Sequence, residues 1–265
     1  MNLLDRPGAA ALRYETYGEL DTRAPIVFLN GMTQTTISWK SQARALADKI
    51  GVITYDARGQ GKSIAGDTAL TLELHADDLA ALLDHLGVDQ AHLVGFSHGA
   101  RVALATANHH AERLASLTLC SATAAPTATA RTILKAWRET LRLGGLEAMS
   151  WCALTAILGD KFLGQNEALI PGIIKASVQR NTEDGVRRLL DAMIEYPNLD
   201  ELARGVSASA LVISGEHDVL VDYDGAKLLA ELCDAEHIEV AGCGHTIPIE
   251  SGAQFRSIIS QFIGV

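Results

Sequence analysis

The fold is decided by residues 91–99, which read Ala91-His92-Leu93-Val94-Gly95-Phe96-Ser97-His98-Gly99. Residues 91–94 form a short aliphatic run typical of a buried strand, and residues 100–111 carry the pattern of a helix. A G-x-S-x-G sequence between strand and helix predicts a sharp, strained turn that exposes the serine hydroxyl. The glycines are needed there because side chains would clash with the neighbouring strand and helix. We therefore predict that Ser97 is a nucleophile, and that the backbone N–H of His98, at the helix N-terminus, stabilises negative charge beside it.

Other short aliphatic runs along the chain predict strands at residues 26–29, 51–55, 117–119, 210–213 and 237–240. Helical patterns alternate with these runs, at residues 71–86, 100–111, 223–233 and 253–263. Strands that alternate with helices predict right-handed crossovers. The expected fold class is therefore α/β, with a mostly parallel sheet and helices on both of its faces.

The alternation stops between residues 126 and 205. This stretch carries four helical patterns, at residues 133–143, 146–158, 173–179 and 185–194, and no convincing buried strand. We expect it to form a helical cap, or lid, inserted in a core domain made of residues 1–125 and 206–265. A separately folding domain is less favoured because the chain returns to the sheet at Leu211.

An acid and a base follow two of the predicted strands. Asp218 ends Gly215-Glu216-His217-Asp218, and His245 ends Gly242-Cys243-Gly244-His245. Both therefore lie at the carboxyl ends of strands, the edge where open α/β sheets place their sites and where Ser97 also lies. A serine hydroxyl needs a positioned base, and that base needs an orienting carboxylate. We predict that Ser97, Asp218 and His245 are the catalytic residues, in the chain order Ser-Asp-His that this type of turn requires.

Two other aspartates and one cysteine are alternatives near these residues. Asp222 and Asp224 lie at the start of the helix predicted at residues 223–233, where aspartate is a common N-cap, so Asp218 is preferred. Cys243 is close to His245 in sequence, but a small buried side chain is its more ordinary role.

Composition excludes several classes of partner. The 265 residues include 22 basic and 32 acidic ones, for a net charge of −10 and a pI of about 5.3, which argues against nucleic acid and anionic membranes as partners. No apolar run is long enough for membrane insertion, and no signal peptide is visible. The four cysteines form no C-x-x-C pair and are expected to stay reduced. We expect a cytoplasmic protein; its oligomeric state is left open.

These motifs resemble the α/β-hydrolase superfamily over nearly the whole chain. Residues 56–63, Asp56-Ala57-Arg58-Gly59-Gln60-Gly61-Lys62-Ser63, look like the D-x-R-G-x-G-x-S turn of that superfamily, which is usually structural. The resemblance implies a second oxyanion donor in the loop Asn30-Gly31-Met32, namely the backbone N–H of Met32. Asn30 stands where a histidine is usual. The implied mechanism needs no metal and no organic cofactor.

Within the superfamily the chain looks most like the 3-oxoadipate enol-lactonase and small carboxylesterase branch. This implies an esterase or lactonase that cleaves a small-molecule carboxylic ester, lactone or thioester through an acyl-enzyme. Two alternatives stay open. One is an acyltransferase that moves an acyl chain between carrier protein and coenzyme A thioesters, and the other is a non-catalytic ligand-binding protein on the same fold.

Substrate contacts are expected from the cap and from the loop after residues 26–29. The candidate substrate-binding residues are Gly31, Trp137, Trp151 and Phe162, although helical core packing is the commoner use of such aromatic residues.

Overall fold

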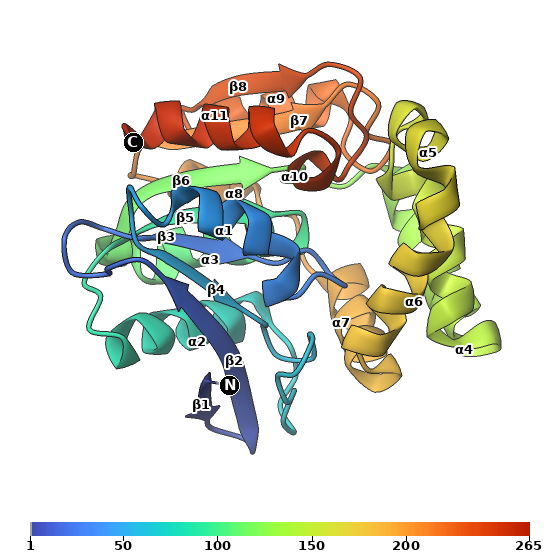
Figure 1. The fold of residues 1–265 in the computed structure, drawn as a ribbon, viewed down its shortest axis with the longest axis horizontal. Helices are drawn as coiled ribbons and strands as arrows, with labels where there is room; N and C mark the ends of the chain where they lie inside the picture. Colours follow the sequence, from blue (N-terminus) through green and yellow to red (C-terminus); the bar gives the residue numbers. More distant parts are fainter. Residues whose placement is uncertain (1) are drawn as a thin grey trace.

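The computed structural model describes residues 2–265 and contains one eight-stranded sheet, in the order β1-β2-β4-β3-β5-β6-β7-β8 (Figure 1). The strands are β1 (Asn2–Arg6), β2 (Ala10–Tyr17), β3 (Ile26–Leu29), β4 (Val52–Tyr55), β5 (Ala91–Phe96), β6 (Leu114–Cys120), β7 (Ala210–Gly215) and β8 (Glu236–Val240). Strands β4, β3 and β5 to β8 run parallel to one another, whereas β1 and β2 form an antiparallel edge. The predicted α/β class and the predicted parallel strands are therefore confirmed.

The edge hairpin β1–β2 is the part of the sheet that sequence patterns did not predict. Its side chains are polar or half-exposed along most of β1, unlike the fully buried β3 and β4. An edge strand buries one face at most, so its sequence lacks the continuous apolar run by which central parallel strands are recognised.

Helices cover both faces of the sheet, and each face has its own core. On one face α2 (Leu72–His85), α3 (His98–His109) and α9 (Tyr223–Leu232) pack through aliphatic side chains. On the other, α1 (Lys40–Leu46) and α11 (Gly252–Ile263) cover β3, β4 and β7, and Trp39 stacks on Phe28 at a ring separation of 4.5 Å. The core is mostly aliphatic, as the low aromatic content of 5% requires.

A helical insertion lies between β6 and β7, at one end of the sheet (Figure 1). It consists of α4 (Ala128–Ile157), α5 (Asp160–Asn166), α6 (Ile170–Arg180) and α7 (Glu183–Glu195). Residues 128–195 contain no strand. Gly145 breaks α4 with a φ of +74°, and this kink divides the long helix into two parts.

The insertion ends earlier than the predicted boundary at residue 205. The short helix α8 (Asp200–Arg204) packs against α3 and α9, and its Ala203, together with the preceding Leu199, belongs to the core under the sheet. Packing thus returns the chain to the core at about residue 199, because α8 buries its apolar side there rather than against α4–α7.

Two further structural findings bear on the sequence expectations. Among the helices of residues 2–265, none is both long enough and apolar enough to cross a membrane. All four cysteines are free thiols, with Cys120, Cys233 and Cys243 buried and Cys152 exposed.

Candidate active site

Ser97 occupies the turn between β5 and α3 in a strained backbone conformation, with φ +54° and ψ −115°. Non-glycine residues rarely adopt a positive φ, and such strain is found mainly at functional sites. The flanking glycines make this turn possible. A Cβ at Gly95 would lie 2.5 Å from the Ala100 Cα, and one at Gly99 would lie 2.3 Å from the Leu29 carbonyl oxygen.

A continuous chain of hydrogen bonds joins the three predicted catalytic side chains. His245 Nδ1 lies 2.7 Å from Asp218 Oδ2, and His245 Nε2 lies 2.9 Å from Ser97 Oγ. An ionised carboxylate can only accept, so Nδ1 carries the imidazole proton and Nε2 is left free to accept from the serine hydroxyl. The imidazole and the carboxylate are both buried, and Ser97 is partly exposed. The structure thus brings these residues, separated by up to 148 positions, into the geometry of a Ser-His-Asp triad.

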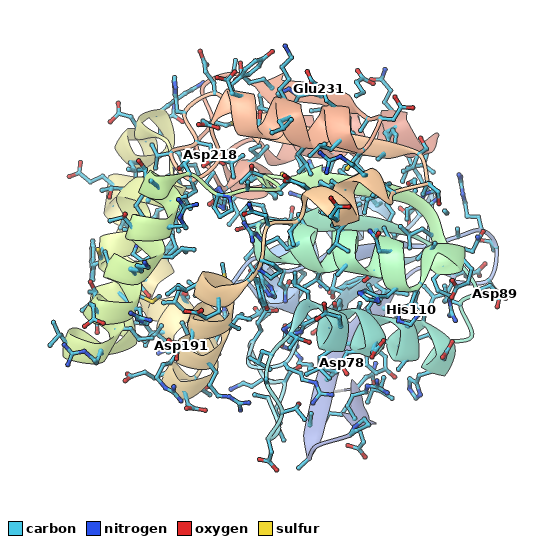
Figure 2. All side chains as sticks on the ribbon, turned by 180° about the vertical axis from the view of Figure 1, so that it is seen from behind. Asp78, Asp89, His110, Asp191, Asp218 and Glu231 are labelled. Carbon is cyan, nitrogen blue, oxygen red and sulfur yellow. The ribbon has the colours of Figure 1, made fainter. Side chains whose placement is uncertain are left out.

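Backbone amides hold Asp218 in place. Its Oδ1 accepts from the N–H groups of Leu220 at 2.8 Å and Val221 at 3.0 Å, which leaves Oδ2 for His245. Figure 2 shows Asp218 beside the helices of the insertion, far from Asp78 on α2. The alternative acids are exposed, and Asp222 caps α9 by accepting from the Gly225 N–H at 2.9 Å. Asp218 is therefore the carboxylate that reaches the histidine.

A second carboxylate, Glu250, holds the backbone on either side of His245. Its Oε2 accepts from Gly244 N–H and from Gly159 N–H, each at 2.9 Å, and its Oε1 accepts from Thr246 N–H at 2.9 Å. Gly159 lies between α4 and α5, so this carboxylate connects the loop of His245 to the helical insertion. Nothing local to the helix Ile247–Glu250 (α10) indicated this role, and sequence reasoning missed it.

The loop Asn30-Gly31-Met32 is fixed by three side chains. Asn30 donates to the Tyr55 carbonyl at 2.8 Å and accepts from the Trp39 indole N–H at 2.7 Å. Gln60 donates to the carbonyl groups of Gly31 at 2.9 Å and Met32 at 3.2 Å. Asn30, in place of the usual histidine, therefore anchors the loop to the core. The turn at residues 56–63 also holds this loop, through the hydrogen bonds of Gln60.

The backbone N–H groups of Met32 and His98 remain available. Within residues 2–265 neither group donates to an acceptor of the protein. The imidazole of His98, by contrast, points into the core: its Nε2 lies 3.3 Å from the Tyr196 hydroxyl, and its ring meets His75 edge to face at 5.2 Å. Burial holds the pKa of His98 well below its usual value, so this imidazole is neutral at physiological pH.

A largely apolar cavity opens over Ser97 and His245. Its walls come from the loop at residues 31–35, from α4 and α6, and from the loops before α9 and around α10. The principal apolar lining residues are Met32, Phe96, Leu134, Trp137, Met149, Leu154, Ile157, Leu158, Phe162, Ile174, Met193 and Leu220. Such a cavity, with a few polar groups at one point, is typical of a small-molecule site.

The structure places most of the predicted substrate-binding residues in this cavity. Gly31, Trp137 and Phe162 line it, but Trp151 does not. Trp151 is 45% exposed, because the face of α4 that carries Met149, Ala153 and Ile157 turns inward and leaves position 151 on the side toward solvent. The expectation for Trp151 was therefore wrong. Cys243 is buried and does not line the cavity.

Comparison with known proteins identifies a family model and several relatives that match most of the chain. Residues 24–251 match the family model described as alpha/beta hydrolase fold. The chain is 27% identical to 3-oxoadipate enol-lactonase 2 of Acinetobacter baylyi, over 94% of this chain and 91% of that protein. It is 26% identical to a putative carbamate hydrolase, RutD, of Pantoea ananatis, over 94% and 92% respectively.

Solved structures agree with these relatives. The enol-lactonase from Burkholderia xenovorans LB400 superposes with a TM-score of 0.90 at 26% identity, covering 100% of both chains. A thermophilic esterase from Thermogutta terrifontis superposes with a TM-score of 0.86 at 26% identity, over 98% of this chain and 96% of the esterase. From its fold, its site geometry and the matched family model, we conclude that the chain belongs to the α/β hydrolase fold family.

Proposed function

We propose that the protein is a serine hydrolase of the esterase or lactonase type, which cleaves a carboxylic ester, lactone or thioester through an acyl-enzyme. The observation that carries this proposal is the unbroken hydrogen-bond chain from Asp218 through His245 to Ser97, at the base of an apolar cavity. The relatives support it, since their names and titles include enol-lactonases, an esterase and putative carbamate hydrolases, all of which act on acyl groups.

The reaction begins at Ser97. Its oxygen attacks the substrate carbonyl carbon while its proton passes to His245 Nε2, and Asp218 stabilises the imidazolium that forms. The tetrahedral intermediate then collapses as His245 donates the proton to the leaving alkoxide or thiolate, and the acyl group remains on Ser97. A water molecule, deprotonated by the same imidazole, releases the acid and restores the serine.

The N–H groups of Met32 and His98 are the proposed oxyanion donors. The first lies in the loop after β3, and the second belongs to the first residue of α3, directly after Ser97. Each such donor contributes about 3–4 kcal/mol to transition-state stabilisation in comparable sites. Because backbone groups supply both bonds, the side chains of Met32 and His98 are free for other contacts.

The helical insertion is the proposed lid of this core domain. Trp137, Phe162 and their aliphatic neighbours give it an apolar wall, which suits an acyl chain of small to medium length. Helices that exclude water from the cavity would also strengthen the hydrogen bonds to the oxyanion.

The test is a panel of chromogenic esters, lactones and acyl thioesters of graded length, with the wild-type protein and a Ser97→Ala variant. Turnover that disappears in the variant while the fold is retained supports the proposal. A fluorophosphonate probe should add its mass to Ser97 of the wild type.

Two outcomes would favour a different function. Absence of both labelling and turnover in folded protein would favour a binding protein. Partitioning of the acyl-enzyme to an added alcohol or thiol in preference to water would favour an acyltransferase.

A further inference from the structure

The turn at residues 56–63 contacts the loop of the proposed oxyanion donor through one side chain, that of Gln60. This side chain is completely buried. Its Nε2 donates to the carbonyl oxygens of Gly31 at 2.9 Å and Met32 at 3.2 Å, and its Oε1 accepts from the Ala57 N–H at 3.1 Å. Because the Ala57 N–H can bond only to the amide oxygen, the amide has one orientation, and both of its N–H donors face the loop.

One of the two carbonyl groups belongs to the same peptide group as the proposed oxyanion donor. The Gly31 carbonyl and the Met32 N–H are the two sides of one peptide bond, and this bond is trans. In a trans peptide the C=O and N–H bonds lie in one plane and point in opposite directions. A side chain that holds the Gly31 carbonyl therefore also fixes the direction of the Met32 N–H.

The Gly31 carbonyl accepts a second hydrogen bond, from the backbone N–H of Gln34 at 3.1 Å. A carbonyl oxygen has two lone pairs, so this oxygen is fully bonded and cannot turn without losing both bonds. The Met32 N–H has no acceptor among residues 2–265, and Gly31 and Met32 both line the cavity. The carbonyl thus faces the protein, and the N–H is left for a ligand in the cavity.

The turn that carries Gln60 is itself held by the helical insertion. The Gly61 N–H donates to the Asn181 Oδ1 at 3.1 Å, and a Cβ at Gly185 would lie 2.3 Å from the Gly59 carbonyl oxygen. Gly59 and Gly61 have φ angles of +78° and +54°, which glycine adopts without strain. Gln60 therefore lies between the insertion and the loop, and it cannot withdraw from the loop unless α6 or α7 also moves.

We propose that Gln60 is a positioning residue for the reaction, which directs the Met32 N–H at the oxyanion by holding the Gly31 carbonyl. The same hydrogen bond polarises the peptide group and makes its N–H a stronger donor. Among the described residues, Gln60 is not one of those that line the cavity, so it acts only through the loop. The inference rests on the proposed hydrolase function, because the role requires an oxyanion.

Gln60→Met tests this role, because methionine has about the length of glutamine but no N–H donor. Negative charge develops on the carbonyl oxygen only after Ser97 attacks, so the variant should affect kcat and not substrate binding. Loss of an oxyanion donor costs about 10²–10³ in kcat, and a misdirected donor keeps part of its effect. For a neutral 4-nitrophenyl ester we expect kcat to fall about tenfold to a hundredfold, with a change in KM below about twofold.

A transition-state analogue gives a second measurement. A trifluoromethyl ketone forms a hemiketal with the Ser97 oxygen, and the former carbonyl oxygen then occupies the place of the oxyanion. Its inhibition constant should rise by the same factor by which kcat/KM falls. Gln60→His, whose imidazole offers one N–H donor in place of two, should recover part of both quantities. A change in stability alone would not move the two in parallel.

Asn108→Leu is the matched control. The Asn108 Nδ2 also donates to two backbone carbonyl groups, those of Leu104 at 3.0 Å and Leu202 at 2.6 Å, but it joins α3 to α8 and is not among the residues of the cavity wall. The variant removes the same kind of contact. It should lower the urea midpoint of unfolding and leave kcat and the inhibition constant of the ketone unchanged.

If Gln60→Met does not fold, Gln60→Asn takes its place, since it keeps a neutral amide but withdraws it from the Gly31 carbonyl by one methylene. The same loss of kcat is expected. A folded variant with the wild-type kcat would overturn the inference, as would a loss confined to KM or an unchanged inhibition constant. In these cases wild-type turnover and labelling of Ser97 leave the proposed function standing. A wild type that neither cleaves esters nor reacts with the fluorophosphonate would overturn both.

Discussion

Glu250→Gln tests how the loop of His245 is held. The carboxylate accepts three backbone N–H groups, from Gly159, Gly244 and Thr246, each at 2.9 Å. The amide of glutamine has a single acceptor oxygen, and its NH₂ group would face an N–H that it cannot satisfy. Neighbouring glycines leave no room for a rearrangement, since a Cβ at Gly244 would lie 2.5 Å from the Gly159 nitrogen.

The magnitude follows from this geometry. One charge-assisted hydrogen bond is lost, which costs about 1.5–3 kcal/mol of stability. The other two become hydrogen bonds to a neutral amide, and each then contributes about 1 kcal/mol less to stability. Glu250 is only partly buried, so water recovers some of this loss. We expect the free energy of unfolding to fall by about 2–3 kcal/mol. Because the loop carries His245, we also expect kcat to fall about tenfold, with a smaller effect on KM.

The assays are urea denaturation at neutral pH and steady-state hydrolysis of a neutral chromogenic ester. Glu231→Gln is the matched control, since Glu231 is exposed on α9, away from the cavity (Figure 2). It removes the same charge and should change neither quantity measurably. Stability and kcat equal to those of the control would refute the reasoning.

The remaining predictions concern the predicted orienting carboxylate, a buried histidine and the turn at Ser97. Asp218→Asn should keep the fold but lower kcat by about 10⁴, as in comparable triads, because the amide favours the wrong imidazole tautomer; a loss below tenfold in ester turnover would contradict this. Burial lowers the pKa of His75 to about 4. Between pH 6.5 and 4 the folded protein therefore binds fewer protons than the unfolded chain. The free energy of unfolding is thus highest above pH 6.5 and declines as the pH falls. Urea denaturation should show a loss of stability from pH 6.5 to pH 5 that is smaller by about 1.5 kcal/mol in His75→Phe, and an unchanged pH dependence in that variant would count against the shift. Gly99→Ala would bring a Cβ within 2.3 Å of the Leu29 carbonyl oxygen, so thermal denaturation should show a loss of about 3 kcal/mol, and a variant as stable as the wild type would disprove the close packing of α3 on β3.

The central strands and the positions of Ser97, Asp218 and His245 could be predicted because each depends on a local pattern. A buried parallel strand needs an unbroken aliphatic run, and a polar residue directly after it falls at the carboxyl edge of the sheet. The turn at Ser97 is likewise indicated by glycines at two fixed positions. Each of these features can be predicted from about ten consecutive residues, so its prediction requires no knowledge of contacts between distant parts of the chain.

Features that depend on a one-sided or irregular environment were harder to predict. The hairpin β1–β2 has mixed burial and no continuous apolar run. The exposure of Trp151 follows from which face of α4 turns toward the cavity, and only the packing of α4 shows that this is the face of Met149, Ala153 and Ile157. Similarly, α8 looks like a part of the insertion in the sequence, and only its packing on α3 and α9 assigns it to the core.

The sequence by itself therefore determined the fold class, the parallel central strands and the three side chains of the predicted triad. Only the tertiary structure decided what holds and surrounds them: Glu250 reaches Gly159 across 91 positions, and Asn181 reaches Gly61 across 120. It also placed Arg180 in the wall of the cavity. The physical reason is that such contacts join backbone groups and side chains whose separation in the sequence carries no periodic signal, so they exist only once the sheet and the helical insertion have packed together.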